Sequence, residues 1–137
     1  MSSQRIAEGP FTLISSAQNF TGSWADLGSE IAVNGFNSIG LWLNIDINDS
    51  VNTRVRLIAK HTTAGTNEYS LPLKDASATE VSVVGEYYEF TSDADQKIVL
   101  SWDIDNVIPI VQFQIQAGTA GASPGQIDDA VYTIGYK

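Results

Sequence analysis

Residues 39–47 alternate strictly between apolar and other side chains, and this pattern constrains the fold more than any other part of the chain. A repeat of two is the period of a β-strand that packs one face on a core and turns the other face to water. Trp42 is out of phase with the apolar residues, so it is either an exposed anchor or the sign of a second covered face. The apolar members of the pattern are Ile39, Leu41, Leu43, Ile45 and Ile47.

Similar short segments recur along the chain, separated by Gly, Asn, Asp and Ser residues that are typical of turns. No window has apolar residues at the i, i+3, i+4 and i+7 spacing of a helix. We therefore expect an all-β fold, an antiparallel two-sheet sandwich or jelly roll of about eight to ten short strands. Besides residues 39–47, strands are expected at residues 11–15, 30–33, 53–60, 68–73, 80–84, 87–91, 97–104, 108–117 and 130–136.

The length of 137 residues indicates one domain, and the chain shows no fixed-period repeat and no linker. Residues 1–10 mix polar and charged residues and end in Gly-Pro, which predicts a flexible N-terminal arm outside the sheets. Residues 11–137 then form the sandwich. Residues 118–125 are rich in small residues and predict a mobile or partner-facing loop between the last two strands.

Charge and composition exclude several functional classes. Sixteen Asp and Glu against seven Lys and Arg give a net charge of −9, which disfavours binding to nucleic acid or to an anionic membrane. Cysteine is absent, which excludes disulfides, thiolate metal sites and cysteine nucleophiles. No apolar run reaches the roughly 18 residues of a membrane helix, and no signal peptide is recognisable at the start. The expectation is a soluble protein that is made in the cytoplasm.

The residues that catalysis would need form no recognisable motif. His61 is the only histidine, and no Gly-x-Ser-x-Gly segment places a nucleophilic serine for it. Glu86 and Glu89 would point to opposite faces of a strand, so they do not form the carboxylate pair of a glycosidase. We expect no enzyme, no catalytic residue and no cofactor.

Acidic and amide side chains gather at four places, where they can serve β-turns or bind calcium. None of the four fits the helix–loop–helix calcium motif. Turn formation is the preferred interpretation, and a calcium ion that bridges two turns or two subunits is the alternative. The four groups are Asp46, Asn48 and Asp49; Asp93 and Asp95; Asp103, Asp105 and Asn106; Asp128 and Asp129.

Basic and amide side chains line two of the expected strands. Arg54, Arg56 and Lys60 share one face of one strand. They either pair across strands with acids such as Glu86 or Glu89, or match an acidic partner or a neighbouring copy of the chain. A ladder of Gln112, Gln114 and Gln116 suits a wet face or a hydrogen-bonded interface.

Aromatic side chains are the remaining candidates for contact with a partner. Trp102 is in phase with core residues and is predicted to be buried. The segment 130–136 has apolar residues in both registers, so both of its faces should be covered, by its own sheets or by another subunit. The candidate interface residues are Arg54, Arg56, Lys60, Trp42, Tyr132 and Tyr136.

Three segments together suggest a family: residues 11–22, residues 40–49, and residues 111–118 with the small-residue loop and last strand that follow. They resemble the small, acidic, cysteine-free β-sandwich proteins encoded among tailed-bacteriophage virion genes, in particular head decoration (cement) proteins. The resemblance covers most of the chain and carries over no functional residue. It implies a virion protein, a homo-oligomer with a trimer favoured, that binds the major capsid protein or another virion protein.

Two alternatives remain open at this point. One is a carbohydrate-binding or adhesin-type sandwich that recognises glycans through exposed aromatic side chains. The other is a β-rich part of a tail or baseplate.

Overall fold

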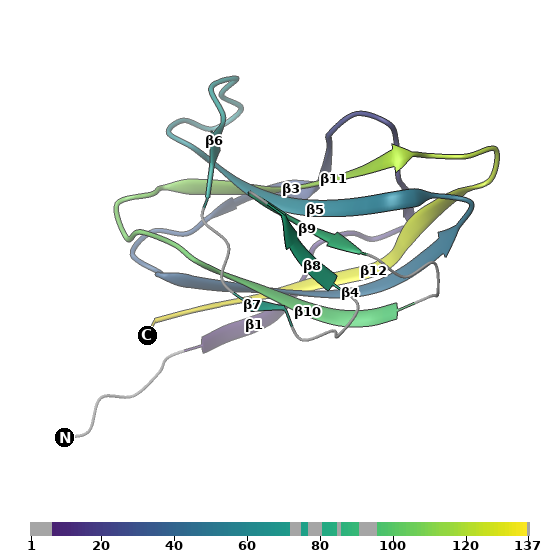
Figure 1. Cartoon of the computed structure of the whole chain (residues 1–137). Coiled ribbons are helices and arrows are strands. Elements are labelled where there is room, and N and C mark those ends of the chain that lie inside the picture. The colour runs from purple at the N-terminus through teal and green to yellow at the C-terminus, as the bar shows by residue number, and fades with distance from the viewer. Residues whose placement is uncertain (1–6, 72–74, 77–80, 85, 91–95, 137) are drawn as a thin grey trace.

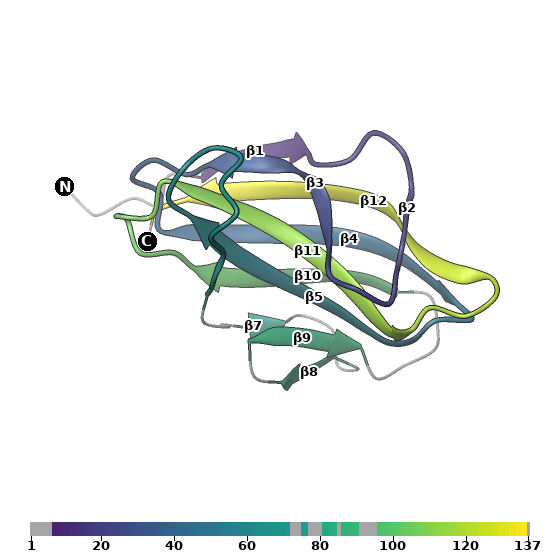
Figure 2. The same ribbon diagram turned by 90° about the horizontal axis from the view of Figure 1, so that it is seen from above.

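A computed structural model describes residues 7–71, 75–76, 81–84, 86–90 and 96–136 as a sandwich of two antiparallel β-sheets (Figure 1). The described residues contain twelve strands and no helix. The all-β, two-sheet fold predicted from the alternating segments is therefore confirmed. Figure 2 shows the two sheets from above, with long strands of one sheet running over those of the other.

Each sheet has six strands, and the long strands that follow one another in sequence alternate between the sheets. Sheet A contains, in spatial order, β1 (Ala7–Thr12), β12 (Pro124–Gly135), β4 (Ser38–Asn48), β10 (Gln96–Asp103) and β7 (Asp75–Ala76), with β2 (Gln18–Asn19) also paired to β12. Sheet B contains β3 (Ala25–Ala32), β11 (Ile110–Thr119), β5 (Val51–Lys60), β9 (Tyr87–Phe90) and β8 (Val81–Val84), with β6 (Tyr69–Ser70) also paired to β5.

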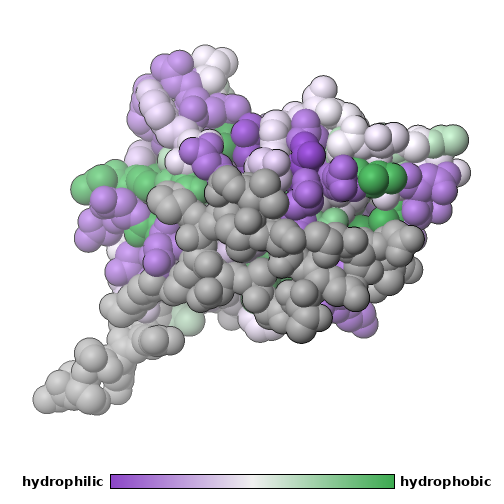
Figure 3. Space-filling view, viewed as in Figure 1, coloured by the Kyte–Doolittle hydropathy of each residue, from purple (hydrophilic) through white to green (hydrophobic). Residues whose placement is uncertain are grey.

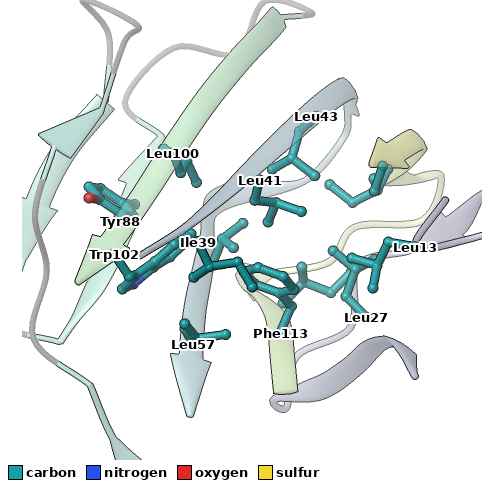
Figure 4. Close-up of a cluster of buried hydrophobic side chains, with 14 of the residues drawn as sticks. Leu13, Leu27, Ile39, Leu41, Leu43, Leu57, Tyr88, Leu100, Trp102 and Phe113 are labelled. Atoms are coloured by element: carbon teal, nitrogen blue, oxygen red, sulfur yellow. The ribbon is translucent and has the colours of Figure 1, made fainter. Parts of the chain in front are cut away.

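The core lies between the sheets and is built from the inward positions of the long strands. All five apolar residues of the alternating segment 39–47 are buried, as the pattern predicted. Trp102 of sheet A is fully buried against two aromatic rings of sheet B (Figure 4). Its ring centroid lies 5.1 Å from that of Tyr88 and 5.4 Å from that of Phe113. The predicted burial of Trp102 is confirmed, and this aromatic cluster joins the two sheets.

The N-terminal segment differs from its prediction. Ala7 to Pro10 are not part of an arm outside the sheets, because they belong to β1, in which Ala7 lies opposite Gly135 of β12. All six residues of β1 are exposed. An edge strand of this kind is held by backbone pairing and not by buried side chains, so its sequence carries no alternation that would reveal it. Residues 1–6 lie outside the described residues.

The loop predicted at residues 118–125 is shorter than expected, since β11 continues to Thr119 and β12 starts at Pro124. The connection is also tied to the turn between β4 and β5. Asp49 N donates to Ser123 O at 3.1 Å, and Ser50 Oγ donates to Ala120 O at 2.8 Å. These bonds hold the loop against its own domain.

Candidate functional site

The outer face of sheet B carries the two arginines of the predicted basic stripe, and both are bonded within the chain. Arg54 Nε donates to Glu89 Oε2 at 2.7 Å. Arg56 Nε and Nη2 both donate to Gln114 Oε1, at 2.9 and 2.6 Å. Burial lowers the pKa of Arg56, and the nearby carboxylates oppose this shift. Cross-strand pairing with Glu89 is confirmed for Arg54, so this guanidinium is not left for an acidic partner.

Aromatic rings cover the same two guanidinium groups. Arg56 Cζ lies 4.2 Å from the ring centroid of Trp24, and Arg54 Cζ lies 5.1 Å from that of Tyr87. The two rings are themselves 5.8 Å apart. Cation–π contacts of this kind stabilise a partly desolvated cation. The sequence did not indicate Trp24 as a partner of Arg56. Trp24 lies just before β3, Arg56 lies in β5, and β11 runs between these two strands.

The glutamine ladder also serves the domain itself. Gln112 and Gln114 are buried. Gln112 Nε2 donates to Gly28 O at 3.1 Å, and Gln114 Nε2 donates to Asp26 Oδ1 at 2.9 Å. Both bonds tie β11 to β3. The glutamine ladder was predicted to line a wet face or a hydrogen-bonded interface. At Gln112 and Gln114 it instead forms a hydrogen-bond network within the chain.

Lys60, the third basic candidate, forms an ion pair in which its Nζ lies 3.0 Å from Glu30 Oε2. Lys60 is only 7% exposed. The bond from Ala64 N to Glu30 Oε1, 2.9 Å long, and then the contact with Lys60 lower the pKa of Glu30. The hydrogen bond to Glu30 raises the pKa of Lys60. Glu30 of β3 thus holds the end of β5 through Lys60 and the loop after it through Ala64, and Lys60 is not a free interface charge.

We expect this pair to make stability depend on pH in the acid range. Because the pKa of Glu30 is lowered in the folded state, its contribution is present above its ordinary value of 4.5 and is lost as pH falls through the folded-state value. The variant Glu30→Gln lacks this contribution. Thermal unfolding followed by circular dichroism should show the gap between wild type and Glu30→Gln shrinking from about pH 6 to about pH 3. The exposed control Glu8→Gln should show no such closing gap, and a constant gap for Glu30→Gln would contradict the argument.

The two candidate tyrosines lie on β12 and just beyond its end. Tyr132 is half-buried, its ring centroid is 5.2 Å from that of Phe11, and burial raises its pKa. Tyr136 is 39% exposed and stacks on Phe36 at 4.7 Å. The expectation that both faces of residues 130–136 are covered is met on the inner face, where Ala130 and Ile134 are buried and Tyr132 is half-buried. On the outer face Val131 is only partly buried. Tyr136, beyond the end of β12, keeps an exposed part.

Exposed apolar side chains gather at the end of the sandwich where β12 finishes, which Figure 3 shows as green atoms at the left edge. Val107 is 79% exposed there. Asp105 holds it in a turn, since its Oδ1 accepts from Val107 N at 3.1 Å and its O accepts from Ile108 N at 2.9 Å. We call Phe36, Val107, Ile108 and Tyr136 the apolar end. Sequence reasoning missed Phe36 and Val107, although Asp105 and Asn106 already indicated a turn.

Backbone hydrogen bonds join the loops of the apolar end. Val33 N donates to Pro109 O at 3.0 Å. Asn37 N donates to Gly135 O at 3.1 Å, and Ile104 N donates to Asn37 O at 2.9 Å. The three segments that supply the apolar end are thus held together before any partner binds.

The outer face of sheet A carries Trp42, which is 48% exposed. Of the two interpretations of Trp42, exposure is therefore the one that holds within the described chain, and no second face covers this residue. Trp42 borders an open hollow of about 400 Å³. Outward side chains of three strands line this hollow with it: Val99 and Lys97 of β10, Asn44 of β4, and Val131 and Asp129 of β12.

The turn interpretation of the acidic groups considered for calcium holds for Asp49 and Asp105. The other described acids of these groups lie in strands: Asp46 in β4, Asp103 in β10, and Asp128 and Asp129 in β12. Asp49 Oδ2 accepts from Ser123 N at 3.2 Å, and Asp128 Oδ1 accepts from Gln126 Nε2 at 2.6 Å. Among the described residues, no three His, Asp or Glu side chains come close enough to hold a metal ion. His61 is exposed, and its Nε2 lies 3.5 Å from Asn67 Nδ2. Asp93 and Asp95 lie outside the described residues.

Comparison of the chain with protein-family models and with curated proteins finds no match. The described part of the chain contains no helix of the length and apolar character needed to cross a membrane. Two surfaces of the described chain are candidates for contact with another molecule, the apolar end and the hollow beside Trp42.

Proposed function

We propose that this protein is a non-enzymatic structural protein of a virion, a decoration protein that binds the outside of a phage head and stabilises it. The observation that carries the proposal is the apolar end, where Val107 and Tyr136 are exposed on loops fixed by backbone hydrogen bonds. A rigid apolar surface loses little conformational entropy when a partner covers it.

The charged and polar groups elsewhere on the surface also favour binding through the apolar end. On the outer face of sheet B, Arg54, Arg56 and Gln114 are bonded to groups of their own chain, so this face offers few unpaired charges to a partner. The net charge of −9 keeps the protein soluble before it assembles on a head. Binding through a small apolar surface then adds about 25 cal/mol for each Å² of apolar area that is covered. Several copies acting together, such as a trimer, multiply this effect.

The proposal is tested by co-sedimentation with undecorated heads. The heads are assembled from the major capsid protein whose gene lies nearest to the gene for this protein. We expect wild type to sediment with the heads. Val107→Asp should weaken the binding about tenfold or more, because a carboxylate would lose its water at the centre of the contact. The matched control is Val51→Asp, since Val51 is also exposed, at 53%, and begins β5 at the opposite end of the sandwich. Equal binding of the two variants would overturn the role of the apolar end.

Solution mass, measured by light scattering after size exclusion, gives an independent reading. A trimer or another closed ring in wild type, reduced to monomer by Val107→Asp, would place the apolar end between copies. A monomer that still binds heads would place it against the capsid. A monomer that binds no heads would contradict the proposed function.

A further inference from the structure

Three parallel rows of side chains cross the outer face of sheet A at the hollow beside Trp42. The middle row is apolar, because Val99 and Val131 lie on either side of Trp42. The rows on either side of it are polar. One consists of Lys97, Asn44 and Asp129, and the other of Ser101, Gly40 and Thr133.

The indole edge lies over Gly40, two residues earlier on the same strand. A Cβ at Gly40 would stand 3.8 Å from Trp42 Nε1, an ordinary van der Waals distance. Nε1 donates to Thr133 Oγ1 at 3.4 Å. The ring is held at this edge while about half of the residue stays exposed, at 48%. A flat aromatic surface fixed in this way is suited to stacking.

The surface of the hollow itself is apolar, and the polar row beside the indole places both donors and acceptors at its rim. Two residues along a strand span about 7 Å, so Asn44 lies within reach of a ligand that sits on Trp42. Lys97 and Asp129 flank Asn44 in register on the two neighbouring strands. Their charges are opposite, so the row as a whole favours neither an anion nor a cation. An amide, an ammonium and a carboxylate together can bind a set of neutral hydroxyl groups.

We propose that the hollow beside Trp42 is a carbohydrate-binding site that takes one pyranose ring of a neutral glycan. The apolar face of the sugar stacks on the indole, and its hydroxyl groups bond to Asn44, Lys97 and Asp129. A protein partner fits less well, since a middle row of three apolar side chains is small against the roughly 800 Å² per side of a stable interface. The site is separate from the apolar end and does not depend on the proposed attachment to heads.

The test uses a glycan array that displays oligosaccharides of glucose, galactose, mannose and N-acetylglucosamine. We expect wild type to bind at least one class, because dense display compensates for a weak single site. Trp42→Ala should weaken binding about tenfold or more, and Asn44→Ala or Asp129→Ala should each weaken it severalfold. The matched control is Trp24→Ala, which removes a tryptophan that packs on Arg56 of sheet B and should bind as wild type does.

A titration of ¹⁵N-labelled protein with the sugar identified on the array locates the site. The indole N–H resonance that is missing from Trp42→Ala should shift in wild type, and those of Trp24 and Trp102 should not. The proposal is overturned if wild type binds no glycan on the array, or if Trp42→Ala binds as strongly as wild type. A change of solution mass in Trp42→Ala would also overturn it, because the hollow would then be a contact between copies of the chain.

Discussion

Replacing Trp102 with alanine is expected to lower the free energy of unfolding by about 3–5 kcal/mol. The side chain is fully buried, and its ring lies between the sheets against Tyr88 and Phe113. Removing the indole leaves a cavity that the paired strands around it cannot close, because β10 is fixed to β4 along eight residue pairs. Since the whole stability of a domain is about 5–15 kcal/mol, this single change should remove a large part of it.

Urea unfolding followed by circular dichroism measures this loss, and Trp42→Ala is the control for it. Both residues are tryptophans on neighbouring strands of sheet A, and they differ in which face of the sheet they occupy. Trp42→Ala should cost less than about 1 kcal/mol, since the indole is half exposed and leaves no internal cavity. Equal losses for the two variants would mean that the aromatic cluster does not hold the sheets together.

The burial of Trp102 and the position of Trp42 on the opposite face of the sheet could be predicted, because a period of two fixes the direction of each side chain once a strand is recognised. The pattern does not decide whether Trp42 is exposed or covered. The same reasoning located the long central strands. It failed at Ala7–Pro10, where an edge strand has only exposed side chains and so has no apolar pattern. It also placed the start of β3 at Glu30 instead of Ala25, since the pairing of β3 with β11 shifts register around Gly28, whose φ is +70°, and the apolar alternation loses its phase there.

The candidate surfaces were only partly predictable, because each depends on which strands are neighbours. The sequence suggested Glu86 or Glu89 as cross-strand partners of the basic stripe, with an acidic partner as the alternative. The register of β5 and β9 brings Glu89 opposite Arg54. The contact of Arg56 with Gln114 needs β11 beside β5, which no local pattern reveals. The apolar end combines Phe36, Val107 and Tyr136 from three distant segments. These residues come close together only when the chain folds.

The second large expected effect is the loss of stability in Gly125→Ala, at a point where β12 packs closely on β4. Gly125 is buried in β12, its N–H donates to Ser50 Oγ at 2.8 Å, and its carbonyl accepts from Phe20 N at 2.9 Å. A Cβ at this position would collide with the backbone carbonyl oxygens of Asp46 and Ile47. Backbone atoms cannot rotate away as a flexible side chain can, so Gly125→Ala must push β12 away from β4. We expect a loss of about 3 kcal/mol in the free energy of unfolding.

The control for this substitution is Gly22→Ala, because no atom lies within 4 Å of the position that a Cβ would take at Gly22. Both variants add one methyl group and restrict the unfolded chain equally, so the difference between them measures the steric conflict alone. Gly22→Ala should change stability by less than about 0.5 kcal/mol in the same urea experiment. The loss in Gly125→Ala should also disturb the loop that Ser50 fastens, which faster amide hydrogen exchange at Ser123 and Gly125 would report. Equal stability of the two variants would show that β4 and β12 separate at this point without cost, contrary to the close packing of their backbones.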